Sequence, residues 1–140
     1  MKVLRPNFEK RGGLVVVIAQ DVRTKEVLMQ AYTNEECFLE TLRTGKAVYF
    51  STSRKERWLK GETSGDVQEV SDILIDCDGD TLIYVVEQRG HGACHTKARS
   101  CFYRSVVGGM LMDAPKEGIK ENLAVIDVEV VSQIYGGYVI

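Results

Sequence analysis

Short runs of β-branched and aromatic residues recur along this chain and constrain its fold more than any other feature. Glycine or charged residues separate each run from the next. The runs lie at 14–18, 27–29, 47–51, 67–76, 81–88 and 101–107, and residues 126–130 alternate apolar with acidic side chains. Such runs and alternations are typical of β-strands. The sequence therefore predicts a chain dominated by strands.

One helix is predicted, over residues 34–45. Asn34 can cap its start, and the two glutamates that follow suit the positive first turn. Phe38 and Leu42 lie four residues apart, and so on one face, while Gly45 can end the helix in a left-handed conformation. No other segment combines these start and stop signals.

Length and composition fit one folded domain. The chain has 140 residues, of which 44% are hydrophobic and 27% charged, as in ordinary globular proteins. No internal repeat or low-complexity segment suggests a solenoid or a linker. The expected fold is a β-dominated α+β domain, with an antiparallel-rich sheet or open barrel and one main helix.

Charge and cysteine usage limit the partners and the compartment. A formal net charge of -2 offers no global positive field for a nucleic acid, so phosphate recognition must be local. No apolar signal region opens the chain, and no run of eighteen apolar residues suggests membrane insertion. We expect a cytoplasmic protein. In a reducing compartment its four cysteines favour metal binding or burial over disulfides.

An acidic cluster at 76–80 points to metal chemistry. Asp76, Asp78 and Asp80 would repel one another without a neutralising cation. If this segment is extended, the three carboxylates point one way and Cys77 points the other. Hard oxygens suit magnesium and a soft thiolate suits zinc.

Two other interpretations of this cluster were considered. Asp78 and Gly79 could form a simple turn between two strands. The acidic spacing also resembles a calcium-binding EF-hand, but Thr81 stands where that loop needs glycine and strands are predicted on both sides. The EF-hand is therefore rejected.

Cys94 and Cys101 favour zinc. On one helix their sulfurs would lie about 10 Å apart, whereas tetrahedral zinc holds sulfurs roughly 4 Å apart. The chain must therefore fold back between them. With Cys77 they supply three ligands, which is the number in catalytic zinc sites that keep a position for water. Cys37, on the apolar face of the predicted helix, is expected to be an inert core residue.

The two histidines of the chain, His91 and His95, flank Cys94 in the same glycine-rich segment. A histidine beside a zinc ligand could be a fourth ligand or could move protons during catalysis. We assign proton transfer to His95 and no role to His91.

A basic and hydroxyl-rich stretch at 53–65 is the second dense patch. Its cations, hydroxyls and glycine backbone amides suit phosphate oxygens, and Trp58 could pack under a base or anchor the loop. A solvated polar loop is the alternative.

In combination these motifs resemble the phosphoribosyl-AMP cyclohydrolase family. The resemblance covers about residues 8–105, which leaves 106–140 as a C-terminal extension of the same domain, with no recognised motif. The segments that carry it are 19–21, 27–35, 44–45, 58–65, 76–80, 93–96 and 100–102.

The resemblance implies hydrolytic opening of the adenine ring of phosphoribosyl-AMP between N1 and C6, the third step of histidine biosynthesis. It implies a homodimer whose zinc site takes cysteines from both subunits. Among the residues above, it implies that His95 is catalytic, that Cys77, Cys94 and Cys101 bind zinc, that Asp76, Asp78 and Asp80 bind magnesium, and that Arg54, Lys60, Glu62 and Ser64 bind substrate.

Three places depart from the family pattern, and one of them is His91-Gly92, which replaces the usual approach to Ala93. Thr52 stands where arginine is usual, and Lys97 stands where glycine usually follows the Cys-His-Thr triplet. A changed purine phosphate substrate is therefore one alternative. Another is a binding module in which zinc has four protein ligands and only a structural role.

Overall fold

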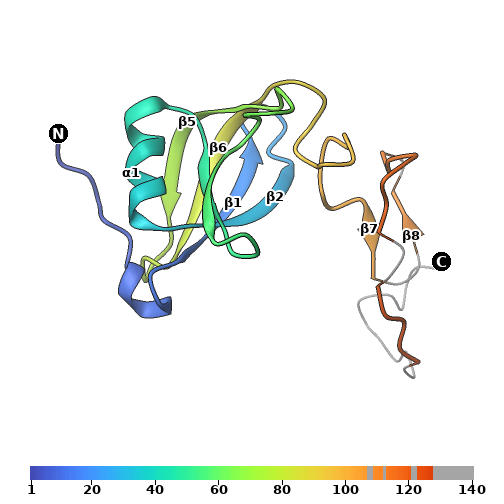
Figure 1. The fold of residues 1–140 in the computed structure, drawn as a ribbon, viewed down its shortest axis with the longest axis horizontal. Helices are drawn as coiled ribbons and strands as arrows, with labels where there is room; N and C mark the ends of the chain where they lie inside the picture. The colour runs from blue at the N-terminus through green and yellow to red at the C-terminus, as the bar shows by residue number, and fades with distance from the viewer. Residues whose placement is uncertain (107–108, 112, 121–122, 128–140) are drawn as a thin grey trace.

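The main body of the protein is a six-stranded sheet with one helix beside it, in a computed structural model that describes residues 1–106, 109–111, 113–120 and 123–127 (Figure 1). A short 3-10 helix, η1 (Phe8–Arg11), precedes the sheet. The sheet order is β4-β3-β2-β1-β6-β5. Its strands are β1 (Val15–Asp21), β2 (Val27–Thr33), β3 (Val48–Ser51), β4 (Glu56–Leu59), β5 (Gln68–Ile75) and β6 (Thr81–Gln88).

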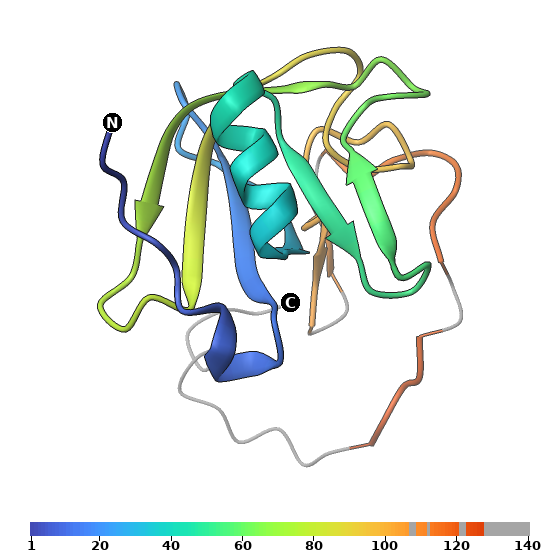
Figure 2. The same ribbon diagram turned by 60° about the vertical axis from the view of Figure 1, so that its left-hand side comes forward.

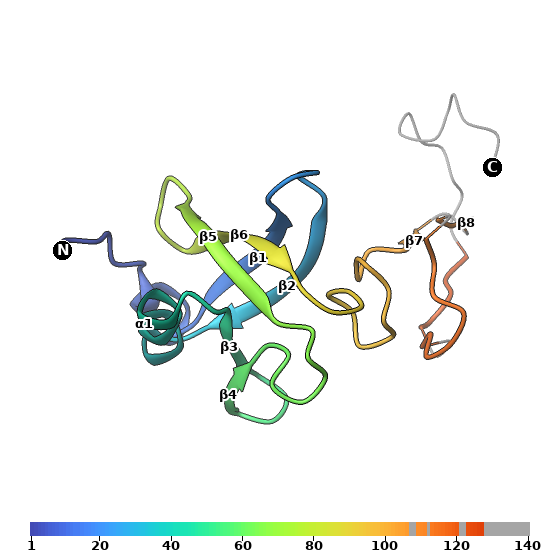
Figure 3. The same cartoon turned by 90° about the horizontal axis from the view of Figure 1, so that it is seen from above.

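The sheet is mixed rather than purely antiparallel. One neighbouring pair, β1 and β6, is parallel, and the other neighbouring strands are antiparallel. The sheet also curls, because the segment before β3 bonds to β5: the Ala47 N–H donates to Gln68 O at 3.0 Å and the Val70 N–H donates to Gly45 O at 2.8 Å. The result is the half-barrel seen from above in Figure 3. The prediction of a strand-rich, open-barrel fold is thus confirmed in its coarse form.

Side chains from both ends of the sheet fill the half-barrel. Along β1, buried and half-buried residues alternate strictly, as expected for a strand with one face on the core. Tyr49 and Tyr84 are fully buried, with ring centroids 5.8 Å apart. The Tyr49 hydroxyl donates to Gln68 Oε1 at 2.5 Å, and Gln68 Nε2 donates to Gln88 Oε1 at 2.9 Å. The polar groups of Tyr49, Gln68 and Gln88 are therefore paired with each other, whereas the buried Tyr84 hydroxyl has no hydrogen-bond partner among the described residues.

The predicted helix is present as α1 (Glu35–Thr44), which packs beside β3 (Figure 2). Asn34 caps it, since its side chain accepts a hydrogen bond from the Cys37 N–H at 2.9 Å. Gly45 ends it in the left-handed region, at φ 74°. Phe38 is buried in the core, while Leu42 is 40% exposed. No helix among the described residues is long and apolar enough to cross a membrane.

Three strand predictions differ from the structure. Of the run 101–107, residues 101–106 are described, and among them only β7 (Arg104–Ser105) is a strand; it pairs with β8 (Gly109–Met110) beyond the end of the main sheet (Figure 1). The first residue of the run, Cys101, is bonded to β2 instead, because its N–H donates to Leu28 O at 2.7 Å. Strand β4 lies in the basic stretch 53–65, for which no strand was predicted. Residues 126 and 127 are not in a strand, and 128–130 lie outside the described residues.

Candidate active site

A cavity of about 560 Å³ lies between the segment that runs from β4 towards β5 and the loop after β6. It gathers side chains that are far apart in the sequence. Trp58 lines this cavity together with six of the predicted site residues. These six are Arg54, Lys60, Glu62, Ser64, His95 and Cys101. The two chemistry-bearing patches of the sequence therefore meet at one place.

The loop after β6 folds back on itself, as the spacing of the two cysteines requires. The Ala93 N–H donates to Arg99 O at 3.0 Å, and the Cys94 N–H donates to Ala98 O at 3.2 Å. Gly92 permits this, since a Cβ at that position would lie 2.2 Å from Ala98 O. The loop thus brings the chain back to the cavity at Cys101, seven residues after Cys94.

Cys94 and Cys101 are close enough to influence each other. The pKa of Cys101 is raised to about 12. The larger cause is desolvation of its thiol, and the next is the neighbouring Cys94. Cys94 is buried, and its Sγ lies 3.0 Å from the Thr96 hydroxyl and 3.9 Å from His95 Nδ1. Two neighbouring thiols are soft donors suited to a soft metal ion, whose charge would favour the thiolates.

Lys60 forms a buried cationic centre beside these thiols. Only 5% of the residue is exposed, and its Nζ lies 5.7 Å from the centre of the Trp58 ring. Burial lowers the pKa of Lys60, although the charges of Asp66, Cys101 and Cys94 oppose the shift. The cavity therefore contains a cation held away from water, where its attraction for an anion is strong.

Asp66 also lines the cavity and was missed in the sequence, where a single aspartate after a glycine carries no distinctive signal. Its Oδ1 accepts a hydrogen bond from the His91 N–H at 2.8 Å and lies 3.4 Å from His91 Nδ1. Burial alone would raise the pKa of Asp66, but hydrogen bonds from His91 and Ser64 outweigh burial and lower it. Gly90 makes room for this carboxylate, because a Cβ there would lie 2.1 Å from Asp66 Oδ1.

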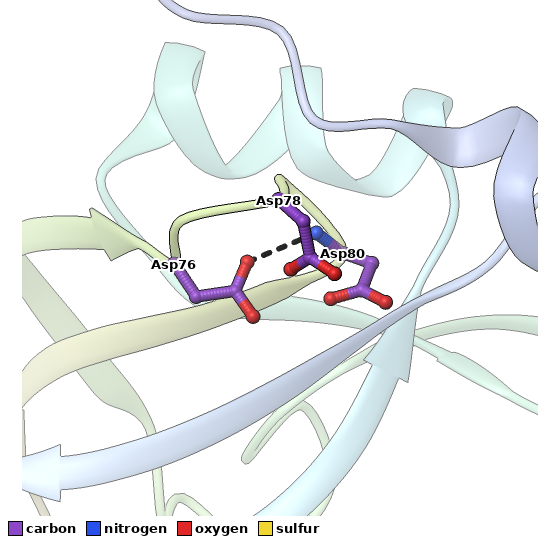
Figure 4. Close-up of side chains that lie close together, drawn as sticks. All are labelled: Asp76, Asp78 and Asp80. Atoms are coloured by element: carbon purple, nitrogen blue, oxygen red, sulfur yellow. Dashed lines mark hydrogen bonds between the residues drawn. The ribbon is translucent and has the colours of Figure 1, made fainter.

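The acidic cluster lies in the turn between β5 and β6 (Figure 4). The extended conformation expected for 76–80 is wrong, and the turn interpretation is correct. Asp76 Oδ1 accepts from the Asp80 N–H at 3.1 Å, and Gly79 is left-handed at φ 78°. The turn nevertheless brings oxygens of Asp76, Asp78 and Asp80 within 4.8 Å of one another. A turn closes this cluster more tightly than a strand, in which alternate residues are about 7 Å apart.

Two basic residues of η1 neutralise this cluster. Lys10 Nζ lies 2.6 Å from Asp78 Oδ2 and 3.1 Å from Asp80 Oδ2. Arg11 donates to the same Asp80 oxygen at 3.1 and 3.2 Å. Hydrogen bonding to Lys10 holds the pKa of Asp80 far below its usual range. Asp80 is thus held in its ionised form, and the turn already attracts the cationic side chains of Lys10 and Arg11.

Cys77 is exposed in the same turn, at the start of β6, whereas Cys94 and Cys101 follow the end of that strand. Eight strand residues separate the two ends by roughly 25 Å. Within the part of the chain that is described, the three aspartates alone have the mutual spacing of ligands to one ion. A single copy therefore does not bring the three predicted zinc ligands together.

Comparison with known proteins follows the same residues. Residues 29–103 match the family model for phosphoribosyl-AMP cyclohydrolase. The chain belongs to this family. It is 62% identical over 101 residues to the phosphoribosyl-AMP cyclohydrolase of Archaeoglobus fulgidus. The aligned residues make up 72% of this chain and 92% of the relative. It is 56% identical over 103 residues to that of Desulforapulum autotrophicum, with coverage of 74% and 82%. The resemblance and the cyclohydrolase class expected from the sequence are thus confirmed.

A third relative is named for its part in histidine biosynthesis. The chain is 57% identical over 106 residues to a histidine biosynthesis bifunctional protein of Aquifex aeolicus, of which it matches 51%. The matched 29–103 region contains the cavity, the folded-back loop and the acidic turn. It excludes Lys10, Arg11 and everything after Tyr103.

Both predicted metals fit the donors that the structure provides. Cys101, which lines the cavity, and the neighbouring buried Cys94 are soft donors, which suits zinc. The aspartate oxygens of the acidic turn are hard donors within a few ångströms of one another, which suits magnesium. The amines of Lys10 and Arg11 would have to give way, at least in part, to a magnesium ion there.

Proposed function

We propose that this chain hydrolyses the N1–C6 bond of phosphoribosyl-AMP, which is the third step of histidine biosynthesis. The observation that carries the proposal is the meeting of two segments at one cavity. One contributes the thiol and imidazole of Cys101 and His95, and the other contributes the cations and hydroxyl of Arg54, Lys60 and Ser64. Relatives that share more than half of their matched residues carry the name of this activity.

The proposed zinc ligands are Cys77, Cys94 and Cys101, supplied by two subunits of a homodimer. The support is geometric: Cys94 and Cys101 influence each other, while Cys77 lies at the opposite end of β6. A second copy that placed its exposed Cys77 at the cavity would complete a three-thiolate set, and the same contact repeated by symmetry would make two sites per dimer.

Magnesium is proposed at the acidic turn, bound by Asp76, Asp78 and Asp80. These carboxylates lie beside Cys77, so in the proposed dimer they would approach the partner's cavity together with it. A divalent cation there would bring positive charge to the phosphates of the substrate, in addition to that of Arg54 and Lys60.

The residues of the cavity account for binding and for proton movement. Bound zinc supplies a Lewis acid and a nucleophilic water near neutral pH. In the reaction the oxygen of water adds to C6, the N1–C6 bond breaks, and its electron pair leaves on N1. His95, exposed at the cavity and 3.9 Å from Cys94 Sγ, is placed to carry the proton from the water to the departing nitrogen.

Buried Lys60 would hold the anionic end of the substrate in a dry part of the cavity, where charge pairing is strong. The hydroxyl of Ser64 and the amides around Gly61 are further donors. Gly61 cannot be replaced easily, because a Cβ there would lie 2.3 Å from the Val67 nitrogen. The segment is thus shaped to keep its backbone close to the cavity.

The test is turnover of phosphoribosyl-AMP by protein loaded with zinc and magnesium, followed by the absorbance change on ring opening. Cys94→Ala should abolish turnover, as should chelation of the metals. Cys37→Ser should not, since Cys37 is a buried residue of α1 whose thiol donates to Tyr49 O. No turnover by a folded, zinc-loaded dimer would refute the proposed activity.

A further inference from the structure

We propose that Lys97 binds one of the two phosphate groups of the substrate, as a specificity residue at the rim of the cavity. This inference rests on the proposed function. Lys97 lines the same cavity as Arg54 and Lys60, and it is exposed, whereas Lys60 is buried. It lies at the end of the turn in which its own N–H donates to Cys94 O at 2.9 Å.

Among the described residues, Lys97 is the one exposed cation of this cavity that pairs with no acidic side chain. Arg57 is tied to the Glu40 carboxylate by hydrogen bonds of 2.5 to 3.0 Å. Arg54 lies 3.6 Å from Glu56, and Lys60 is buried near Asp66. Within the described ranges, the Lys97 side chain makes no hydrogen bond and no ion pair. A free ammonium group at a cavity mouth is suited to an incoming anion.

The fold does not need a lysine at this position. Lys97 adopts φ 70°, in the left-handed region, where any side chain with a Cβ is less comfortable than glycine. Lys25 has the same kind of backbone, at φ 65°, in the exposed turn between β1 and β2. Lys25 is absent from the lining of the cavity, so replacing it with glycine measures the free-energy cost of the left-handed backbone alone.

The chemistry of the substrate matches two separate cationic points. Phosphoribosyl-AMP has two phosphate monoesters at opposite ends of the molecule, each close to doubly charged at neutral pH. Arg54 follows β3, while Lys97 belongs to the loop after β6, so the two cations come from different parts of the chain. Lys97 would take the phosphate at one end of the substrate, and Arg54 the phosphate at the other.

The test compares Lys97→Met and Lys97→Gly with Lys25→Gly. A charged contact to phosphate predicts a KM about tenfold higher in both Lys97 variants, with kcat within about twofold of the parent. Lys97→Gly should at the same time melt no lower than the parent, because the backbone strain is relieved. Lys25→Gly should show the same thermal behaviour with unchanged KM. Weaker binding without lower stability is not expected from a purely structural lysine.

Calorimetric titration with AMP, ribose 5-phosphate and adenosine separates this inference from the proposed activity. We expect Lys97→Met to weaken at least one of the two phosphorylated probes about tenfold and to leave adenosine unchanged. Unchanged affinity for both phosphorylated probes would overturn the role of Lys97, as would equal weakening of adenosine. If the parent protein binds the probes but does not turn over phosphoribosyl-AMP, the proposed function fails and the titrations still decide on Lys97.

Discussion

The Asp66 carboxylate accepts a 2.8 Å hydrogen bond from the His91 N–H and thereby ties the segment before β5 to the loop that carries Cys94 and Cys101. Asp66→Ala removes this acceptor, and a hydrogen bond to a charged group contributes about 1.5 to 3 kcal/mol. We expect kcat/KM to fall at least about tenfold, because the loop loses its position. Urea unfolding and steady-state kinetics measure both effects.

Asp66→Asn is the matched control, since its amide oxygen can still accept from His91. It should recover most of the stability and at least part of kcat/KM. Equal losses in the two variants would show that the charge of Asp66, rather than this hydrogen bond, is what matters.

The pairing of Tyr49 with Gln68 inside the half-barrel predicts a stability effect far from the chemistry. Tyr49→Phe leaves the buried Gln68 Oε1 without its 2.5 Å donor and should destabilise the fold by about 1 to 3 kcal/mol. Tyr32→Phe is the control, because Tyr32 is 37% exposed and its hydroxyl has no hydrogen-bond partner in the described part of the chain. A loss from Tyr32→Phe as large as that from Tyr49→Phe would contradict the assignment.

Asp21 predicts a specific dependence of stability on pH. Its Oδ2 accepts from the Thr24 N–H at 2.7 Å and the Arg23 N–H at 3.0 Å, and the Thr24 bond is the largest cause of its lowered pKa. Because the pKa is lower in the folded state, this stabilisation is complete above the unfolded value of about 3.9 and is lost as the pH falls below it.

Asp21→Asn keeps the shape of the side chain without its charge, and should cost about 2 kcal/mol at neutral pH. Urea unfolding of parent and variant at pH 7 and pH 3 should show a smaller difference at pH 3. A difference that stays constant between these values would mean that the pKa of Asp21 is not lowered by folding.

Locally encoded features were predicted well. The helix was predicted because Asn34 and Gly45 each act on the few residues beside them. The return of the chain between Cys94 and Cys101 was predicted because two sulfurs that share an ion must be close. In both cases the determining interactions lie within about ten residues.

Features that depend on distant residues were not predicted. The parallel pairing of β1 with β6 joins segments about sixty residues apart, and strand periodicity contains no information about such partners. Strand β4 was missed because Arg57 and Trp58 belong to a polar stretch whose strand character comes from pairing with β3. Asp66 was missed because its importance lies in its contact with His91, across 25 residues.

The position of Cys77 leads to the sharpest prediction about the proposed metal site. If zinc takes Cys77 from one subunit and Cys94 and Cys101 from the other, homodimers of Cys77→Ser and of Cys94→Ser should each lack zinc. Cys37→Ser should keep the zinc content of the parent, because Cys37 is buried against Tyr49 O. Elemental analysis of the dialysed proteins measures zinc per chain.

Mixing the two zinc-deficient variants then tests whether the site is shared. In a mixed dimer, one site combines both substitutions, while the other combines an intact Cys77 from one chain with an intact Cys94 and Cys101 from its partner. Random mixing should therefore restore about a quarter of the parental zinc and activity. If all three cysteines came from one chain, every site in the mixture would contain a substitution and nothing would be restored. Recovery after mixing would thus require that each zinc site spans two subunits.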